Sequence, residues 1–246
     1  MTDDKIPPNL TEEAEVLFYM GRYDDAIKKC DEILILEPAN HIILTNKGIA
    51  QERLNNFSEA IDSFNEAIKI EKGYSMPYLH LGDILFKYKN FEKSILYYNK
   101  VIELEPDNVF AVNGIAKSNF NLGYKIEAIK KLEALLEKDE FNEITNYNLG
   151  KMYFNENLFE ECIQCLKKSI ICADSTTSRY TTSNIRICLA YILLGDNMSA
   201  INHIEKFILK NPGNFLGLIV KGFVNGLSGD SDQAVLALEK GLKQIE

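Results

Sequence analysis

The sequence has few features that are typical of membrane proteins or of proteins cross-linked by disulfide bonds. Among its 246 residues, no run approaches the roughly 20 apolar residues that a membrane-spanning helix needs. Its N-terminus lacks the basic segment and apolar core of a secretory signal. The five cysteines are an odd number and do not indicate a disulfide framework, so we expect a reducing, cytoplasmic location.

Positive charge is also scarce. The 27 lysines and arginines are outnumbered by 36 aspartates and glutamates, which gives a net charge of −9. Because affinity for nucleic acids comes mainly from cations that neutralise phosphates, this balance disfavours a nucleic-acid-binding protein. The overall composition, with 46% hydrophobic and 26% charged residues, is that of an ordinary soluble globular protein.

Residue patterns that carry catalysis or bind metals are missing as well. The three histidines do not show the spacing of a metalloprotease site, and no glycine-rich phosphate loop opens a helix. Cys162 and Cys165 form a C-x-x-C pair within an expected helix, whereas zinc sites usually present four converging ligands on loops. We interpret these cysteines as packed thiols, and we expect no metal, no cofactor and no enzymatic activity.

The chain repeats itself every 34 residues. Small residues recur at two positions, 12 residues apart, and a turn position holding Gly, Asn or Lys lies between them. Seven units follow from this period: residues 7–40, 41–74, 75–108, 109–142, 143–176, 181–214 and 215–246. Residues 1–6 are expected to form a disordered arm, and residues 177–180 are an insertion between two units.

Each unit is predicted to be a helix–turn–helix hairpin. Apolar residues recur at helical spacing, as in Ile61, Phe64 and Ile68. Gly or Asn at the turn supplies the left-handed conformation that ends the first helix. Prolines such as Pro38 and Pro106 mark the end of the second helix. Because one hairpin cannot bury its apolar face alone, the hairpins are expected to stack.

These features together resemble the tetratricopeptide repeat. The third unit shows the likeness well, with Tyr78, Leu81, Gly82, Leu85, Phe91, Tyr98, Val101 and Pro106. The resemblance implies an all-α fold, an α-solenoid of about seven repeats wound into a right-handed superhelix. It also implies a concave groove, lined by the first helix of each repeat, that receives a peptide or helix of another protein.

A row of polar and basic residues occupies inward-facing positions of this expected groove. The row consists of Asn113, Lys117, Asn148, Lys151 and Arg186. It resembles the carboxylate clamp by which some co-chaperones of the family hold the acidic C-terminal tail of a chaperone, although the order of Asn113 and Lys117 is inverted. Its cations are suited to charge-assisted hydrogen bonds with a carboxylate. The alternative is a solvated helix face.

Beyond this row the expected lining turns apolar, with Leu189, Ile219 and Phe223. Such a patch is either an interaction surface or a wider core at the end of the stack. Solenoids usually end with a polar-faced cap, whereas the last repeat here carries apolar residues with no repeat after them. These residues, a predicted self-association surface, are Leu238, Leu242 and Ile245.

The sequence therefore predicts a non-catalytic scaffold or adaptor that binds a protein or peptide partner. The most specific form of this prediction is a co-chaperone that binds an acidic segment. One alternative is a structural protein that forms a homo-oligomer through its last repeat. Another is the repeat region of a longer enzyme or regulator. The hydroxyl-rich segment 174–183 is predicted to be either a hinge or an enlarged surface loop between the fifth and sixth repeats.

Overall fold

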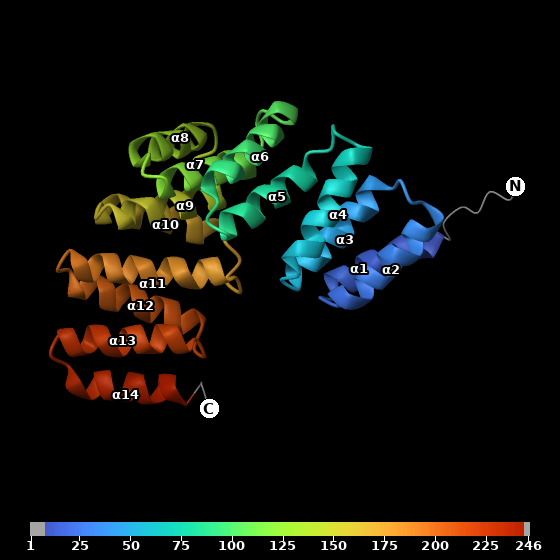
Figure 1. The fold of residues 1–246 in the computed structure, drawn as a ribbon. Helices are drawn as coiled ribbons and strands as arrows, with labels where there is room; N and C mark the ends of the chain where they lie inside the picture. The colour runs from blue at the N-terminus through green and yellow to red at the C-terminus, as the bar shows by residue number, and fades with distance from the viewer. Residues whose placement is uncertain (1–7, 244–246) are drawn as a thin grey trace, which may run out of the picture. The chain divides into compact units, whose positions relative to one another are not determined.

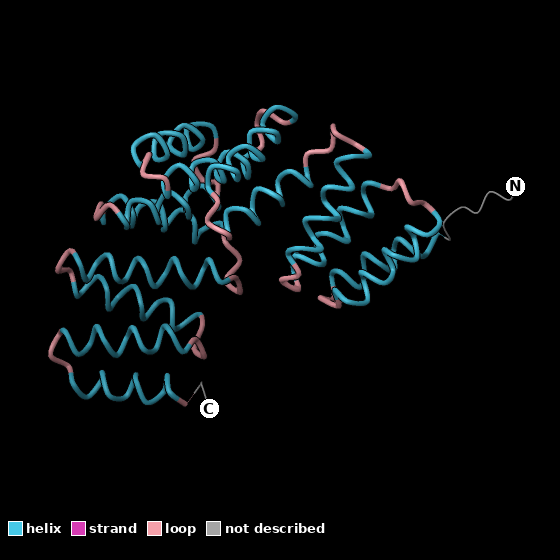
Figure 2. The backbone as a smooth tube through the Cα atoms, in the orientation of Figure 1, coloured by secondary structure: helices cyan, strands magenta, loops and turns pink. Residues whose placement is uncertain are grey.

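The computed structural model describes residues 8–243, which form fourteen helices and no β-strand (Figure 1). In chain order these are α1 (Pro8–Tyr19), α2 (Tyr23–Leu36), α3 (His41–Arg53), α4 (Phe57–Ile70), α5 (Met76–Lys87), α6 (Phe91–Leu104), α7 (Val109–Asn121), α8 (Lys125–Lys138), α9 (Glu143–Asn155), α10 (Phe159–Cys172), α11 (Ser178–Leu193), α12 (Asn197–Lys210), α13 (Phe215–Leu227) and α14 (Ser231–Leu242). Short loops join them (Figure 2). The predicted all-α solenoid is confirmed. The arm expected over 1–6 lies outside the described residues, as does Ile245.

The turn inside each hairpin has the backbone conformation that the sequence predicts. Seven of the residues that the structure describes have a positive φ, and all of them lie at the repeated turn position: Gly21, Asn55, Lys89, Gly123, Asn157, Gly195 and Gly229. Lysine rarely adopts this conformation because its Cβ atom then crowds the next carbonyl oxygen. The repeat therefore imposes the turn on Lys89, whose φ is 59°.

Asparagine side chains fix where several first helices begin. Asn40, Asn108, Asn142 and Asn214 each accept a hydrogen bond from the backbone N–H three residues further on, at 2.9–3.1 Å. Each of these bonds satisfies one of the donors that the first turn of a helix leaves without an intrahelical acceptor. The recurrence of this cap gives successive repeats the same starting register.

Small residues bring the two helices of a hairpin together, as predicted. The early small position is buried in every repeat, from Ala14 to Gly222. The residue 16 positions later packs against it: Phe64 against Gly48 and Leu166 against Gly150, where a Cβ atom on the glycine would lie 2.6–2.7 Å from the larger side chain. A stack of small interlocking cores results.

The described chain divides into two compact units, residues 1–124 and 125–246, and the division falls within the fourth repeat. In the first unit, α3 packs against α5 and α5 against α7. In the second, α11 packs against both α9 and α13. First helices of neighbouring repeats are thus adjacent from α3 to α7 in the first unit and from α9 to α13 in the second, as the solenoid prediction requires.

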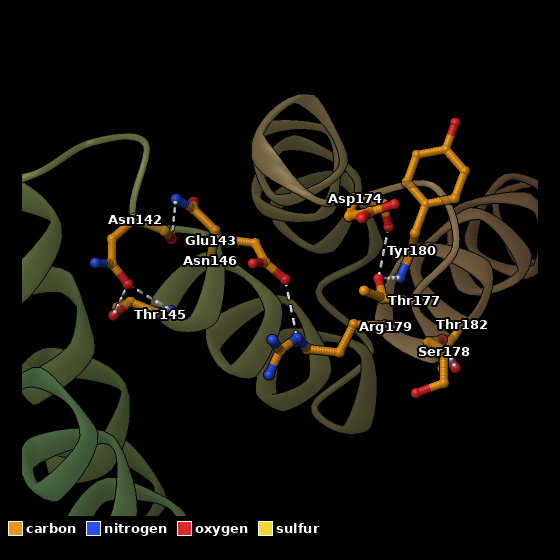
Figure 3. Close-up of polar contacts among 10 residues, drawn as sticks. All are labelled: Asn142, Glu143, Thr145, Asn146, Asp174, Thr177, Ser178, Arg179, Tyr180 and Thr182. Atoms are coloured by element: carbon orange, nitrogen blue, oxygen red, sulfur yellow. Dashed lines mark hydrogen bonds and ion pairs between the residues drawn. The ribbon is translucent and has the colours of Figure 1, made fainter. Parts of the chain in front are cut away.

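The inserted residues 177–180 extend a helix more than they lengthen a loop. Helix α11 begins at Ser178 and has 16 residues, so only residues 173–177 separate it from α10. Thr177 caps this helix, and the Arg179 Nε atom donates to Glu143 at the start of α9, at 2.9 Å (Figure 3). The prediction of an enlarged loop over 174–183 is therefore wrong for most of that segment. The hydroxyl and arginine side chains of the segment stabilise an extra helical turn instead.

Candidate functional site

The five residues of the predicted polar and basic row are divided between the two units. Asn113 and Lys117 lie on α7 in the first unit. Asn148 and Lys151 lie on α9 and Arg186 on α11, in the second unit. All five are on first helices, where the repeat pattern predicts them.

In the first unit, the surroundings of Asn113 and Lys117 differ in kind. Asn113 is only 2% exposed, and its Nδ2 atom donates to the Val109 carbonyl oxygen at 2.9 Å. Lys117 holds its Nζ atom 4.7 Å from the centre of the Phe86 ring. Burial lowers the pKa of this ammonium, and the negative charge of Asp83 opposes the shift. Lys117 is therefore a partly desolvated cation, whereas Asn113 mainly stabilises its own helix.

In the same unit, one carboxylate contacts two basic side chains, and the sequence did not predict these contacts. The Glu52 carboxylate lies 2.8 Å from His80 Nδ1 and 2.8 Å from Lys87 Nζ. Burial opposes ionisation of Glu52, but the hydrogen bonds from His80 and Lys87 outweigh it and lower its pKa to about 2. Because these groups come from α3 and α5, the cluster links two adjacent first helices.

In the second unit, two cations of the row lie over aromatic rings. The Lys151 Nζ atom is 5.3 Å from the centre of the Tyr147 ring, and the Arg186 guanidinium carbon is 5.4 Å from that of Phe154. Such cation–π contacts hold a positive charge without neutralising it. The Arg186 Nη1 atom is buried and has no hydrogen-bond partner among the described residues.

The predicted apolar lining is only partly covered. Leu189 and Ile219 are half-buried, whereas Phe223 is 54% exposed. In the last hairpin, Leu238 packs beside Gly222, where a Cβ atom would lie 2.6 Å from its Cγ atom, and Leu242 remains 58% exposed. An exposed apolar surface therefore exists on α13 and α14, although Leu238 is used mainly inside the hairpin.

The cysteines are free thiols in the structure. Burial raises the pKa of Cys162 to about 12 and that of Cys165 to about 11, which disfavours the thiolate that metals and oxidants require. Residues 8–243 contain no group of three or more His, Cys, Asp or Glu side chains placed to hold a metal ion. In the same range no helix is both long and apolar enough to cross a bilayer.

Models of the tetratricopeptide repeat family match residues 11–75, 77–108 and 145–170 of this chain, together half of its length. Among curated proteins, RNA polymerase II-associated protein 3 of Rattus norvegicus is 31% identical over 182 residues. That alignment covers 69% of this chain but only 28% of the rat protein. The Hsp70-Hsp90 organising protein of Plasmodium falciparum is 24% identical over 140 residues, 56% of each chain.

A solved structure confirms the fold over nearly the whole length. A tetratricopeptide repeat protein from Parabacteroides merdae superimposes with a TM-score of 0.69, covering 96% of this chain and 92% of its own. Its sequence identity is 18%, so the likeness concerns the fold alone.

Proposed function

Because this chain belongs to the tetratricopeptide repeat family, we propose that it is a non-catalytic adaptor that binds a segment of another protein on the first helices of its repeats. Two relatives carry names that describe association with other proteins, an RNA polymerase II-associated protein and an organising protein for Hsp70 and Hsp90. The odd number of cysteines, which does not indicate a disulfide framework, supports a reducing, cytoplasmic location.

The partner segment that this surface fits best is acidic. The observation that carries this proposal is Arg186, whose guanidinium is held by the Phe154 ring and has a nitrogen without an acceptor among the described residues. Within the first unit, Lys117 is a separate desolvated cation that is also suited to a carboxylate. No carboxylate among the described residues pairs with the Arg186 guanidinium, so a carboxylate of the partner would bind its accessible side through a charge-assisted hydrogen bond.

The test is the binding of a fluorescently labelled Asp/Glu-rich peptide with a free C-terminal carboxylate, measured by fluorescence anisotropy. We expect the affinity to fall as salt is raised, since exposed charge pairs are screened. We expect Arg186→Gln to weaken it at least tenfold, because a hydrogen bond to a charged group contributes roughly 1.5–3 kcal/mol. The charge reversal Lys117→Glu should weaken it as well.

The matched control is Arg179→Gln, on the same helix. Arg179 already donates to Glu143, so its removal should leave peptide affinity unchanged (Figure 3). If Arg179→Gln and Arg186→Gln lowered the peptide affinity equally, net charge alone would explain the loss. That result would contradict a specific carboxylate site. Binding that is insensitive to salt would contradict it too.

A second candidate function is self-association through the last repeat. Phe223, Leu227 and Leu242 are each about half exposed or more, and they lie on neighbouring helices of one hairpin. A second copy of the chain would cover this apolar surface. Light scattering at rising concentration should then show oligomers that persist in high salt and disappear in Leu242→Lys, and a strict monomer at all concentrations would refute it.

A further inference from the structure

A cleft opens between α10 and α12, the second helices of the fifth and sixth repeats, with residues of α11 between them. Its volume is about 310 Å³. The residues that line it are Lys167, Ile170, Ile171, Tyr180, Asn184, His203, Lys206, Phe207 and Lys210. Because all of them belong to one compact unit, the cleft does not depend on how the two units are placed. It shares no residue with the polar and basic row on the first helices.

The cleft concentrates positive charge in an acidic protein. Three lysines line it, and no acidic residue does. Lys167 donates to the Tyr191 hydroxyl at 2.8 Å, which leaves its charge unneutralised. Lys206 and Lys210 have neither a hydrogen bond nor an ion pair within the described part of the chain. Glu205, beside Lys206 in the sequence, pairs instead with Lys221 on α13, at 2.9 Å.

His203 adds a polar atom that the fold does not satisfy. Its Nε2 atom is buried and has no partner among residues 8–243, while the ring bonds to the backbone of Asn184. The titratable groups facing the ring are Lys167 of α10, Tyr191 of α11 and Lys206 of α12. Burial, followed by the charges of Lys167 and Lys206, lowers the pKa of His203 to about 4. The imidazole is therefore neutral at pH 7.

The remaining walls are apolar, contributed by Ile170, Ile171 and Phe207. A ligand that matches both parts carries an anionic group for the lysines and an apolar body for these walls. The volume lies at the lower end of small-molecule sites, which suits one compact group more than an extended segment. A phosphate monoester has nearly two negative charges at pH 7 and several acceptor oxygens, enough for Lys206, Lys210 and the imidazole together.

We propose that this cleft binds a phosphate monoester carried on a small apolar group, with Lys206 and Lys210 holding the phosphate and His203 Nε2 donating a further hydrogen bond to it once the ring is protonated. Binding places negative charge beside the imidazole and offsets the two ammonium groups that disfavour its protonation. The pKa of His203 therefore rises in the complex, and the Nε2–H of the imidazolium donates to the phosphate alongside Lys206 and Lys210.

The probe is phenyl phosphate, followed by the ¹⁵N resonances of the histidine side chains. The chain has only three histidines, His41, His80 and His203, so each signal can be assigned by substitution. We expect phenyl phosphate to shift the His203 signals and to raise its pKa by at least one unit, with His41 and His80 unchanged. An unchanged His203 pKa at millimolar phenyl phosphate would overturn the proposal.

Variants and ligand analogues distinguish a specific binding site from non-specific electrostatic attraction. Replacing both lysines, Lys206→Gln with Lys210→Gln, is expected to weaken binding by tenfold or more, whereas Lys240→Gln on exposed α14 leaves it unchanged. Phenol and inorganic phosphate are expected to bind at least tenfold more weakly than phenyl phosphate. The proposal would be overturned if inorganic phosphate bound as tightly as phenyl phosphate. It would also be overturned if Lys240→Gln weakened binding as much as the double variant at Lys206 and Lys210.

Discussion

The ring of Tyr98 occupies the space that a side chain at Gly82 would need: a Cβ atom there would lie 2.7 Å from the Tyr98 Cε1 atom. The same ring meets Gly114 of the next repeat, where a Cβ atom would be closer still. Tyr98 is completely buried, and its hydroxyl donates to Asp83 at 2.6 Å. One aromatic side chain thus joins two repeats through two glycines.

Replacing the second of these glycines should destabilise the protein. In Gly114→Ala the added methyl group overlaps the Tyr98 ring, which is buried and hydrogen-bonded and therefore has little room to move. Overpacking of this kind typically costs about 1–3 kcal/mol. Urea unfolding followed by circular dichroism measures the change.

The control for Gly114→Ala is a glycine with open space beside it. A Cβ atom at Gly226, inside α13, would meet only the Ala234 Cβ atom, at 3.9 Å. Gly226→Ala should therefore raise the free energy of unfolding by up to about 1 kcal/mol, because alanine is the better helix former. Stabilisation by both substitutions would contradict the close packing of Tyr98.

Lys89 offers the opposite kind of test, in which glycine is the better residue. Its left-handed conformation costs about 1–2 kcal/mol for a residue with a Cβ atom, and glycine avoids that cost but loses about 0.5–1 kcal/mol of chain entropy on folding. Lys89→Gly should therefore stabilise the protein by about 1 kcal/mol or less, measured as a shift of the urea midpoint.

The same substitution at a helical lysine separates this effect from the loss of charge. Lys130 is exposed within α8, where glycine costs about 1 kcal/mol relative to a good helix former. Lys130→Gly should therefore destabilise the protein. The argument from backbone strain fails if Lys89→Gly and Lys130→Gly change stability in the same direction.

The features that the sequence predicts are those set by short-range rules that repeat. The alternation of helices, the small packing positions and the left-handed turn follow from one period, and the period identified Lys89 as a turn residue although lysine does not favour that conformation. Asn113 shows where the period is not enough. Its position on a first helix was correct, but its burial depends on how neighbouring repeats pack.

Contacts between repeats could not be predicted because they depend on the rotation of one hairpin against the next. Glu52 and His80 are 28 residues apart, and Arg179 and Glu143 are 36 apart. No local pattern marks these partners. The cleft between α10 and α12 has the same origin, since its lysines have no distinguishing sequence pattern and come together only because both helices pack against α11.

The Glu52 cluster gives the protein a specific acid sensitivity. The pKa of Glu52 is lowered from 4.5 to about 2 in the folded state, so the folded form holds its proton less tightly than the unfolded chain. Its stabilising contribution is complete above pH 4.5 and is lost as the pH falls toward 2. In Glu52→Gln this part of the pH dependence should disappear, while Glu66→Gln, at an exposed position on α4, should retain it. Urea unfolding at a series of pH values between 5 and 2 measures both. If Glu52→Gln loses stability with acid as steeply as the wild type, the hydrogen bonds from His80 and Lys87 do not stabilise the ionised carboxylate.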